Sequence, residues 1–359
     1  LLFLPVPSSP PIDIYYSPGV GEGLERHVRA RLPFSGVFER IRFNLLLLGG
    51  QGEHNGIFIS ETGLMRRIGP ADGEIVAANI RTVLDFAGSV SEPFDLPQLP
   101  VFVSVLPSSA AILQQNLPPF SNTVNQRQFI VDVYSALSGH VTPISVYETL
   151  LGRRQQYIYY RTQDNFTSLG GFYISEQMLT RMLGTPAPTL AAYDLTYPHN
   201  DFYGDLYRIS PYRGIRPDTL TLFHYNSFQR HYMVTHSAPG EQRVYHTMFP
   251  EHLTNFDRPM DVFLGGLSAV TNIHSTAPYH RSLLVFGDET ALAYAPFLAN
   301  HYQLVSIVDL FDPGAALLGI RAENYSQVLF AYGARTFMTM EIPAETLGII
   351  AAAYMTADS

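Results

Sequence analysis

The sequence of 359 residues contains no cysteine, no tryptophan and no lysine, so all 22 of its basic residues are arginines. Without cysteine it can form neither a disulfide framework nor a thiolate metal site. Without lysine it has no side-chain amine, which excludes Schiff-base catalysis. These absences narrow the chemistry open to the chain before any motif is considered.

Charged residues are also scarce, at 15% of the chain, whereas hydrophobic residues make up 46%. A disordered chain would be richer in charge and poorer in apolar residues, so this composition predicts a globular protein with a substantial core. The net charge is −9, and no basic cluster is longer than a pair such as Arg66-Arg67. Proteins that neutralise phosphates usually carry a basic patch, so nucleic acid is not expected as a partner.

The chain starts with a short apolar run, Leu1–Pro7, followed by serines and prolines. This run is too short to span a bilayer. We interpret residues 1–22 as an N-terminal arm, either an ordinary apolar segment that docks on the domain or the remnant of an export signal. No other segment reaches 18 consecutive apolar residues, so no membrane-spanning helix is predicted.

Helical and extended patterns alternate along most of the chain. The apolar run Val101–Leu106 is typical of a strand buried on both faces, and Asp72 is placed to cap a helix that runs to about Ala87. The other predicted helices are 23–48 (broken at Pro33), 125–137, 168–183 and 290–302. The other predicted strands are the hairpin 55–65 and the segments 157–160, 283–286, 304–308 and 328–330, while 146–151 fits either type.

Strands that alternate with helices predict a mostly parallel sheet with helices on both faces. The segment from about Gly184 to His280 differs, because it is rich in Tyr, His and Pro and contains alternating runs such as Thr219–Phe223. We interpret this segment as an irregular or strand-rich insertion within a single α/β domain, residues 23–359.

Two polar corners follow predicted strands, one after Tyr160 and one after Phe286. Ligand sites in parallel sheets form beyond the carboxyl ends of the strands. Each corner leads into a predicted helix, a geometry that can hold catalytic groups at the top of a sheet. The binding candidates in these corners are Arg161, Gln163, Asp164, Asn165, Asp288, Glu289 and Thr290.

Both corners resemble signature segments of the bacterial DHHW proteins. Members of that family carry Tyr-Arg-Thr-Asp-His-His-Trp-Thr and then Leu-Gly, where this chain has Tyr160-Arg161-Thr162-Gln163-Asp164-Asn165-Phe166-Thr167-Ser168-Leu169-Gly170. They also carry a late Asp-Ser-Tyr, which stands here as Asp288-Glu289-Thr290, followed by an intact Pro296-Phe297-Leu298 and Asn300-His301-Tyr302. Family landmarks occur in the same order at 55–59, 201–204 and 264–266.

DHHW proteins are similar to SGNH hydrolases and to the alginate O-acetylation proteins. The resemblance therefore implies an SGNH-hydrolase-like (flavodoxin-like) α/β fold. It also implies that an active member uses a Ser-His-Asp triad in the two corners.

The positions that the resemblance assigns to catalysis are altered in this chain. Gln163 stands where the family has the triad aspartate, Asn165 where it has the histidine, and Glu289 where it has the serine. A glutamine has no carboxylate to orient an imidazole, and an asparagine cannot accept a proton near neutral pH. Leu267 replaces an asparagine of the oxyanion site and offers no side-chain donor. These replacements predict a pseudoenzyme with no catalytic residues.

Three interpretations of the polar cluster in the two corners are open. A solvated, hydrogen-bonded corner left after the loss of catalysis is the favoured one. A Ca²⁺ site is the second, since carboxylate and amide oxygens suit that ion, and a carboxylate pair for glycoside chemistry is the third. We predict no metal and no cofactor. The scattered histidines of the middle segment lack a His-Glu-x-x-His pattern and favour ordinary hydrogen-bonded roles; they are His224, His231, His236, His246 and His252.

Two functions follow from these observations. The first is a non-catalytic, extracytoplasmic (secreted or cell-surface) protein that binds an envelope polysaccharide, or that assembles with itself or another surface protein through the segment Gly184–His280. The alternative is an active polysaccharide O-acetyltransferase or esterase with a displaced nucleophile, Thr290 or Ser268. If the alignment of the motifs is right, Gln163, Asn165 and Glu289 meet at the carboxyl ends of the strands.

Overall fold

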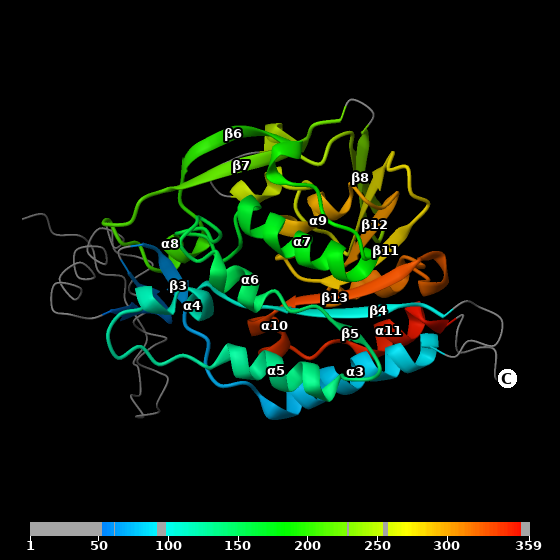
Figure 1. Ribbon diagram of the computed structural model, residues 1–359, viewed down its shortest axis with the longest axis horizontal. Helices are drawn as coiled ribbons and strands as arrows, with labels where there is room; N and C mark the ends of the chain where they lie inside the picture. The colour runs from blue at the N-terminus through cyan, green and yellow to red at the C-terminus, as the bar shows by residue number, and fades with distance from the viewer. Residues whose placement is uncertain (1–51, 61, 92–97, 228–229, 254–257, 353–359) are drawn as a thin grey trace, which may run out of the picture. The chain divides into compact units, whose positions relative to one another are not determined.

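An eight-stranded sheet forms the centre of the structure (Figure 1). The computed structural model describes residues 52–60, 62–91, 98–227, 230–253 and 258–352, all of which belong to one compact unit, Gly52–Ser359. The strand order is β5–β4–β13–β11–β12–β10–β8–β9. The strands are β4 (Val101–Leu106), β5 (Thr142–Pro143), β8 (Tyr232–Ala238), β9 (Glu241–Tyr245), β10 (Val270–Ser275), β11 (Ser282–Gly287), β12 (Leu304–Val308) and β13 (Gln327–Gly333).

The sheet has a parallel part and an antiparallel part. Strands β5, β4, β13, β11 and β12 pair in parallel, and β10, β8 and β9 continue the sheet in antiparallel pairs. Every residue of β4 is buried, as expected for an apolar strand covered on both faces. The prediction of a mostly parallel α/β sheet is therefore confirmed.

Helices cover both faces of this sheet (Figure 1). On the lower face in that view lie α3 (Gly73–Ser91), α5 (Gln126–Ala136), α10 (Ala334–Thr339) and α11 (Ala344–Ile350). On the upper face lie α6 (Tyr147–Gly152), α7 (Ser168–Leu183) and α9 (Ala291–Leu298). No helix in the described ranges is long and apolar enough to cross a membrane.

The remaining strands form two short antiparallel sheets. The first contains β1 (Glu53–His54), β2 (Ile57–Ile59) and β3 (Leu64–Arg66), which confirms the predicted hairpin. Asn55 and Gly56 join β1 to β2 with φ values of 49° and 74°, the left-handed region that a tight two-residue turn requires. The second is a ribbon of β6 (Tyr193–Phe202) and β7 (Asp218–Tyr225).

The segment from Gly184 to His280 is strand-rich, as predicted. It contains β6 to β10, of which β8, β9 and β10 continue the main sheet. The remaining short helices are α4 (Ser109–Ile112), α8 (Asp205–Ile209), η1 (Gln114–Asn116), η2 (Leu190–Ala192), η3 (Glu251–Leu253), η4 (Pro259–Val262), η5 (Pro313–Leu317) and η6 (Ala322–Asn324).

One predicted strand is wrong. Residues 157–160 form a loop that folds back on itself, with a single bridge between Tyr159 and Phe166. The backbone amide of Tyr160 donates to the carbonyl of Asn165 at 3.2 Å, and that of Thr167 donates to Ile158 at 3.1 Å. Because the loop satisfies its own backbone groups, its aromatic pattern does not place it in a sheet.

Two helix ends also differ from the sequence pattern. The helix capped by Asp72 begins at Gly73 and continues to Ser91, and the one predicted to end at Tyr302 ends at Leu298. Residues 146–151, whose pattern fitted either a helix or a strand, correspond to helix α6. The predicted helix 23–48 and the arm 1–22 lie outside the described residues.

Candidate functional site

The two polar corners are brought together by a close crossing of α7 and α9. A Cβ atom added at Gly171 would lie 1.9 Å from the carbonyl oxygen of Ala293, so only glycine allows the two helices to pack here. Helix α7 follows the signature loop, defined here as residues 161–167, and α9 follows Glu289 within two residues. The crossing therefore fixes the spacing between the two corners.

Asn165 and Glu289 lie in direct contact. The side-chain amide Nδ2 of Asn165 donates to the backbone carbonyl of Glu289 at 3.0 Å. Its Oδ1 accepts from the amide of Phe166 at 2.7 Å. Both ends of the Asn165 amide are thus engaged by backbone, and the expected meeting of these two positions is confirmed.

Two cavities meet at Glu289. The first, the Asn165 cavity, has a volume of about 270 Å³ and is lined by Asn165, Asp164, Asp288, Glu289 and Thr290, among others. The second, the Leu267 cavity, has a volume of about 310 Å³ and includes Gln163, Gly266, Leu267 and Glu289 in its lining. The four positions singled out from the sequence (163, 165, 267 and 289) therefore converge on one region of the structure.

Glu289 lines both of these cavities. Its carboxyl group makes no hydrogen bond or ion pair within the described residues. Glu289 is exposed to solvent, although nearby protein atoms partly desolvate its carboxyl. This partial desolvation raises the pKa of Glu289, and the nearby carboxyls of Asp205 and Asp288 raise it further.

Asp288 has a structural role at the end of β11. Its carboxylate accepts from the Gly333 amide at 2.9 Å and from the Thr336 hydroxyl at 2.6 Å, which ties β11 to the end of β13 and the start of α10. It also accepts from the amide and the hydroxyl of Thr290. The oxygens of Asp288 are therefore occupied by protein donors.

The carboxylate of Asp164 is occupied as well, because it pairs with Arg66, whose guanidinium also lies 3.6 Å from Asp205. Within the described ranges, no group of three or more His, Cys, Asp or Glu side chains is arranged to hold a metal ion. The corner thus lacks a donor set for Ca²⁺ among the residues that the structure describes.

No histidine lines either cavity within the described part of the chain. Thr290 donates its hydroxyl to Asp288 at 2.5 Å, and Ser268 donates to the carbonyl of Val270 at 2.8 Å. Hydroxyl–imidazole contacts occur elsewhere, between Ser210 and His54 and between Thr196 and His224. Within the described residues, neither Thr290, which lines the Asn165 cavity, nor Ser268, which lines neither cavity, is hydrogen-bonded to a histidine.

One of the two amides in the glycine pair before Leu267 is already occupied. Gly265 and Gly266 adopt φ values of 81° and 85°, and Leu264 adopts 59°. The amide of Gly266 donates to the carbonyl of Phe263 at 2.9 Å. Leu267 lacks a side-chain donor, so only backbone amides of this turn are left to stabilise a developing oxyanion.

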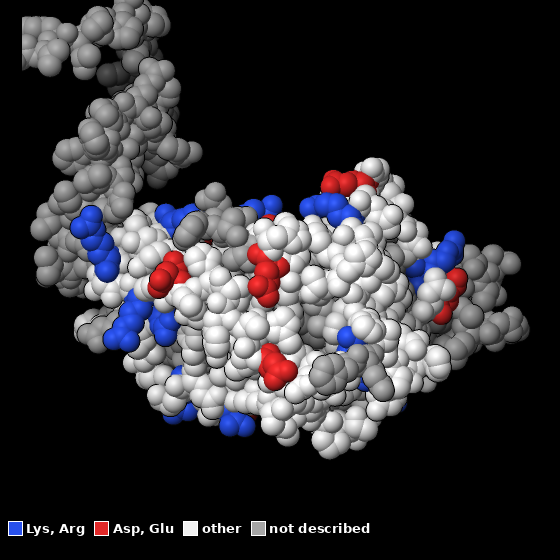
Figure 2. Space-filling view, turned by 90° about the horizontal axis from the view of Figure 1, so that it is seen from above, with Lys and Arg blue, Asp and Glu red and all other residues white. Residues whose placement is uncertain are grey.

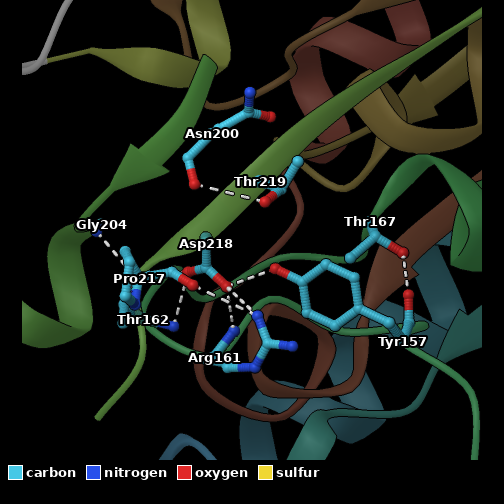
Figure 3. A network of polar contacts seen from close by, with 9 residues as sticks. All are labelled: Tyr157, Arg161, Thr162, Thr167, Asn200, Gly204, Pro217, Asp218 and Thr219. Carbon is cyan, nitrogen blue, oxygen red and sulfur yellow. Dashed lines mark hydrogen bonds and ion pairs between the residues drawn. The ribbon is translucent and has the colours of Figure 1, made fainter. Parts of the chain in front are cut away.

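Arg161 does not join the other candidates. It lines neither cavity at Glu289 and instead belongs to a buried network centred on Asp218 (Figure 3). The Asp218 carboxylate accepts from the backbone amides of Arg161 at 2.6 Å and Thr162 at 2.8 Å, and from the hydroxyls of Tyr157 and Thr162. Sequence reasoning missed Asp218, whose position at the start of β7 carries no local signal of this role.

This network holds the signature loop in place. The Arg161 guanidinium lies 4.2 Å from the centre of the Tyr157 ring, and its Nη1 donates to the carbonyl of Pro217 at 3.2 Å. Burial raises the pKa of the Asp218 carboxyl, and the hydrogen bonds from the loop oppose that shift. The loop that carries Gln163 and Asn165 is thereby fastened to β7.

A mostly parallel sheet with helices on both faces, and a polar corner at the carboxyl end of β11, defines an α/β protein. The model of the DHHW protein family matches residues 99–308, which is more than half of the chain. The chain therefore belongs to the DHHW family. No curated protein matches its sequence.

Solved structures share this fold. A DHHW family protein from Eubacterium siraeum is 19% identical, with a TM-score of 0.67 over 82% of this chain and 95% of the other. PatB1 of Bacillus cereus, in a structure with a sulfonyl adduct, is 17% identical, with a TM-score of 0.64 over 80% and 97%.

Proposed function

We propose that this chain is a non-catalytic, extracytoplasmic member of the DHHW family that binds an envelope saccharide at the cavities around Glu289. The observation that carries the proposal is the contact of Asn165 with Glu289. A hydrolase of this class needs a proton acceptor and a hydroxyl at these two positions, and this chain has an amide and a carboxyl.

The loss of several catalytic groups together supports the absence of turnover. Removing members of a catalytic triad lowers the rate by about 10⁴-fold or more, and a preorganised oxyanion site supplies most of what remains. Here the turn before Leu267 lacks a free donor at Gly266. Residual acyl transfer by this route is therefore expected to be negligible.

The cavities themselves support ligand binding. Their volumes of about 270 and 310 Å³ lie near the lower end of the ~300–1,000 Å³ typical of small-molecule sites. They present the Glu289 carboxyl, the Gln163 amide and Arg335, which together offer hydrogen-bond donors and acceptors to hydroxyl groups. An envelope saccharide fits this chemistry and agrees with the polysaccharide O-acetylation that the family resemblance implies.

The test is a combined labelling and turnover experiment. We expect no hydrolysis of acetyl esters above the buffer rate and no labelling by a sulfonyl fluoride, with PatB1, whose structure holds a sulfonyl adduct, as the positive control. Turnover that disappears in Thr290→Ala or Ser268→Ala, but persists in the surface variant Ser138→Ala, would establish an active enzyme with a displaced nucleophile and overturn the proposal.

A further inference from the structure

A third cavity does not include Glu289 in its lining. Its volume is about 490 Å³, and it includes residues of β3, of η1 and of the loop before Arg161. Three arginines from separate parts of the chain line it: Arg154, Arg161 and Arg216. We call it the arginine cavity.

The charge of this cavity is opposite to that of the protein. No Asp or Glu occurs among the described residues that line it, although the whole chain carries a net charge of −9. Arg154 and Arg216 form no ion pair within the described residues. Asp218 lies behind Arg161, with 4.0 Å between Oδ1 and Nη1, and balances part of the charge of that arginine alone. Within the described residues, no ion pair therefore balances the positive charge of Arg154 and Arg216.

Arg161 is held in a fixed orientation before any ligand arrives. Its guanidinium stacks on Tyr157 and donates to Pro217, and its own carbonyl accepts from the amide of Leu64 at 2.7 Å. A guanidinium held by neighbours loses less side-chain entropy when it pairs with an anion. This fixed arginine forms the base of the cavity, and the exposed Arg154 and Arg216 complete its charged wall.

The other polar groups of the cavity suit hydroxyl groups. Amide side chains line it at Gln115, Asn116, Gln155 and Gln156, and each can both donate and accept. A planar guanidinium matches a carboxylate or a sulfate in a bidentate pair. A ligand with one acidic group and several hydroxyls satisfies both features at once.

We propose that the arginine cavity binds an acidic saccharide through its carboxylate or sulfate group. This site is separate from the cavities at Glu289, and the proposal does not depend on whether those are catalytic. The arginines recognise the anion, and the amides recognise the sugar hydroxyls.

The test uses the full chain and isothermal titration with defined probes. A galacturonic acid hexasaccharide and a sulfated hexasaccharide carry the two acidic groups, while neutral maltohexaose and inorganic phosphate separate the sugar from the charge. We expect one or both acidic hexasaccharides to bind and the neutral one to bind at least about tenfold more weakly. The variant Arg154→Gln/Arg216→Gln should weaken that binding by about 100-fold.

The matched control is Arg153→Gln/Arg213→Gln. These exposed arginines lie one and three residues away in the sequence and do not line the cavity, so the control removes the same charge. It should leave the affinity within about twofold. The proposal is overturned if neither acidic hexasaccharide binds, if phosphate binds as tightly as the saccharides, or if both double variants weaken binding equally.

Discussion

Single residues decide the chemistry at the meeting point of the two corners. Asn165 has an amide whose two ends are bound to backbone, and Glu289 has a carboxyl with no hydrogen bond or ion pair in the described residues. An unpaired, partly desolvated carboxyl disfavours its charged form. The Glu289 carboxyl is therefore available to a ligand. Without a ligand, its charged form slightly destabilises the folded state.

The raised pKa of Glu289 gives the first prediction. The folded state holds this proton more tightly than the unfolded state, so its contribution to stability is complete below the ordinary carboxyl pKa of about 4.3 and is lost as the pH rises through the folded value. Because Glu289 is exposed and solvent screens its charge, Glu289→Gln should raise the melting temperature by only about 1 °C at pH 7 and leave it unchanged near pH 4. Thermal scans over this pH range, with the surface variant Glu323→Gln as control, measure the difference.

Asp218 gives the second prediction at this scale. Asp218→Asn retains the shape of the side chain but turns one acceptor into a donor, which then faces N–H or O–H groups of Arg161, Thr162 or Tyr157. Because the site is fully buried, we expect a loss of about 2–4 kcal/mol in the free energy of unfolding. Urea denaturation measures it, and Asp85→Asn on the exposed side of α3 should change it by less than about 0.5 kcal/mol. Equal effects of the two variants would contradict the role assigned to the network.

At the scale of elements, the crossing of α7 and α9 determines where the corners lie. The carbonyl of Ala293 occupies the space that a side chain at position 171 would need. Helix α3 provides a natural comparison, since Gly88 has nothing within 4 Å of an added Cβ. The same substitution therefore has opposite consequences in the two helices.

We predict that Gly171→Ala destabilises the protein by about 1–3 kcal/mol or more through overpacking. Gly88→Ala should stabilise it by about 0.5–1 kcal/mol, because alanine restricts the unfolded chain and favours helix. Chemical denaturation of both variants supplies the measurement. If Gly171→Ala left the free energy of unfolding unchanged, the two helices could separate freely. Their crossing would then not position Asn165 and Glu289.

At the scale of the whole molecule, the low charge content is visible on the surface. Seen from above, on the side of the β6–β7 ribbon, the described residues show few and scattered charged side chains (Figure 2). Apolar side chains of the ribbon are exposed on the described surface, with Leu195 at 44% and Tyr197 at 55%. Such surfaces often mark interaction sites.

Assembly through the segment Gly184–His280 stays a prediction. We expect light scattering at micromolar concentration to give a mass above that of one chain, and Leu195→Asp/Tyr197→Asp to shift the protein towards the monomer. The control Asp194→Asn alters a neighbouring exposed position of β6 without adding charge to the apolar pair. If the protein is strictly monomeric under these conditions, the assembly hypothesis is excluded and saccharide binding is left as the non-catalytic function.

The sequence by itself determined the architecture and the positions to examine as a candidate site. An apolar run such as Val101–Leu106 indicates a strand that is buried on both faces. Apolar residues at helical spacing indicate a helix with one face against the core. The parallel α/β sheet therefore follows from local patterns. The residues at 163, 165, 267 and 289 are likewise read directly along the chain, through the family motif.

Only the tertiary structure decided which of these residues meet and which do not. It placed Asn165 against Glu289, turned Arg161 towards Asp218 and formed residues 157–160 into a loop. These outcomes depend on contacts between residues far apart in the sequence, such as Gly171 with Ala293, and local periodicity does not encode such contacts. A buried carboxylate like Asp218 has no sequence signature, because its partners are backbone amides that only the fold brings within reach.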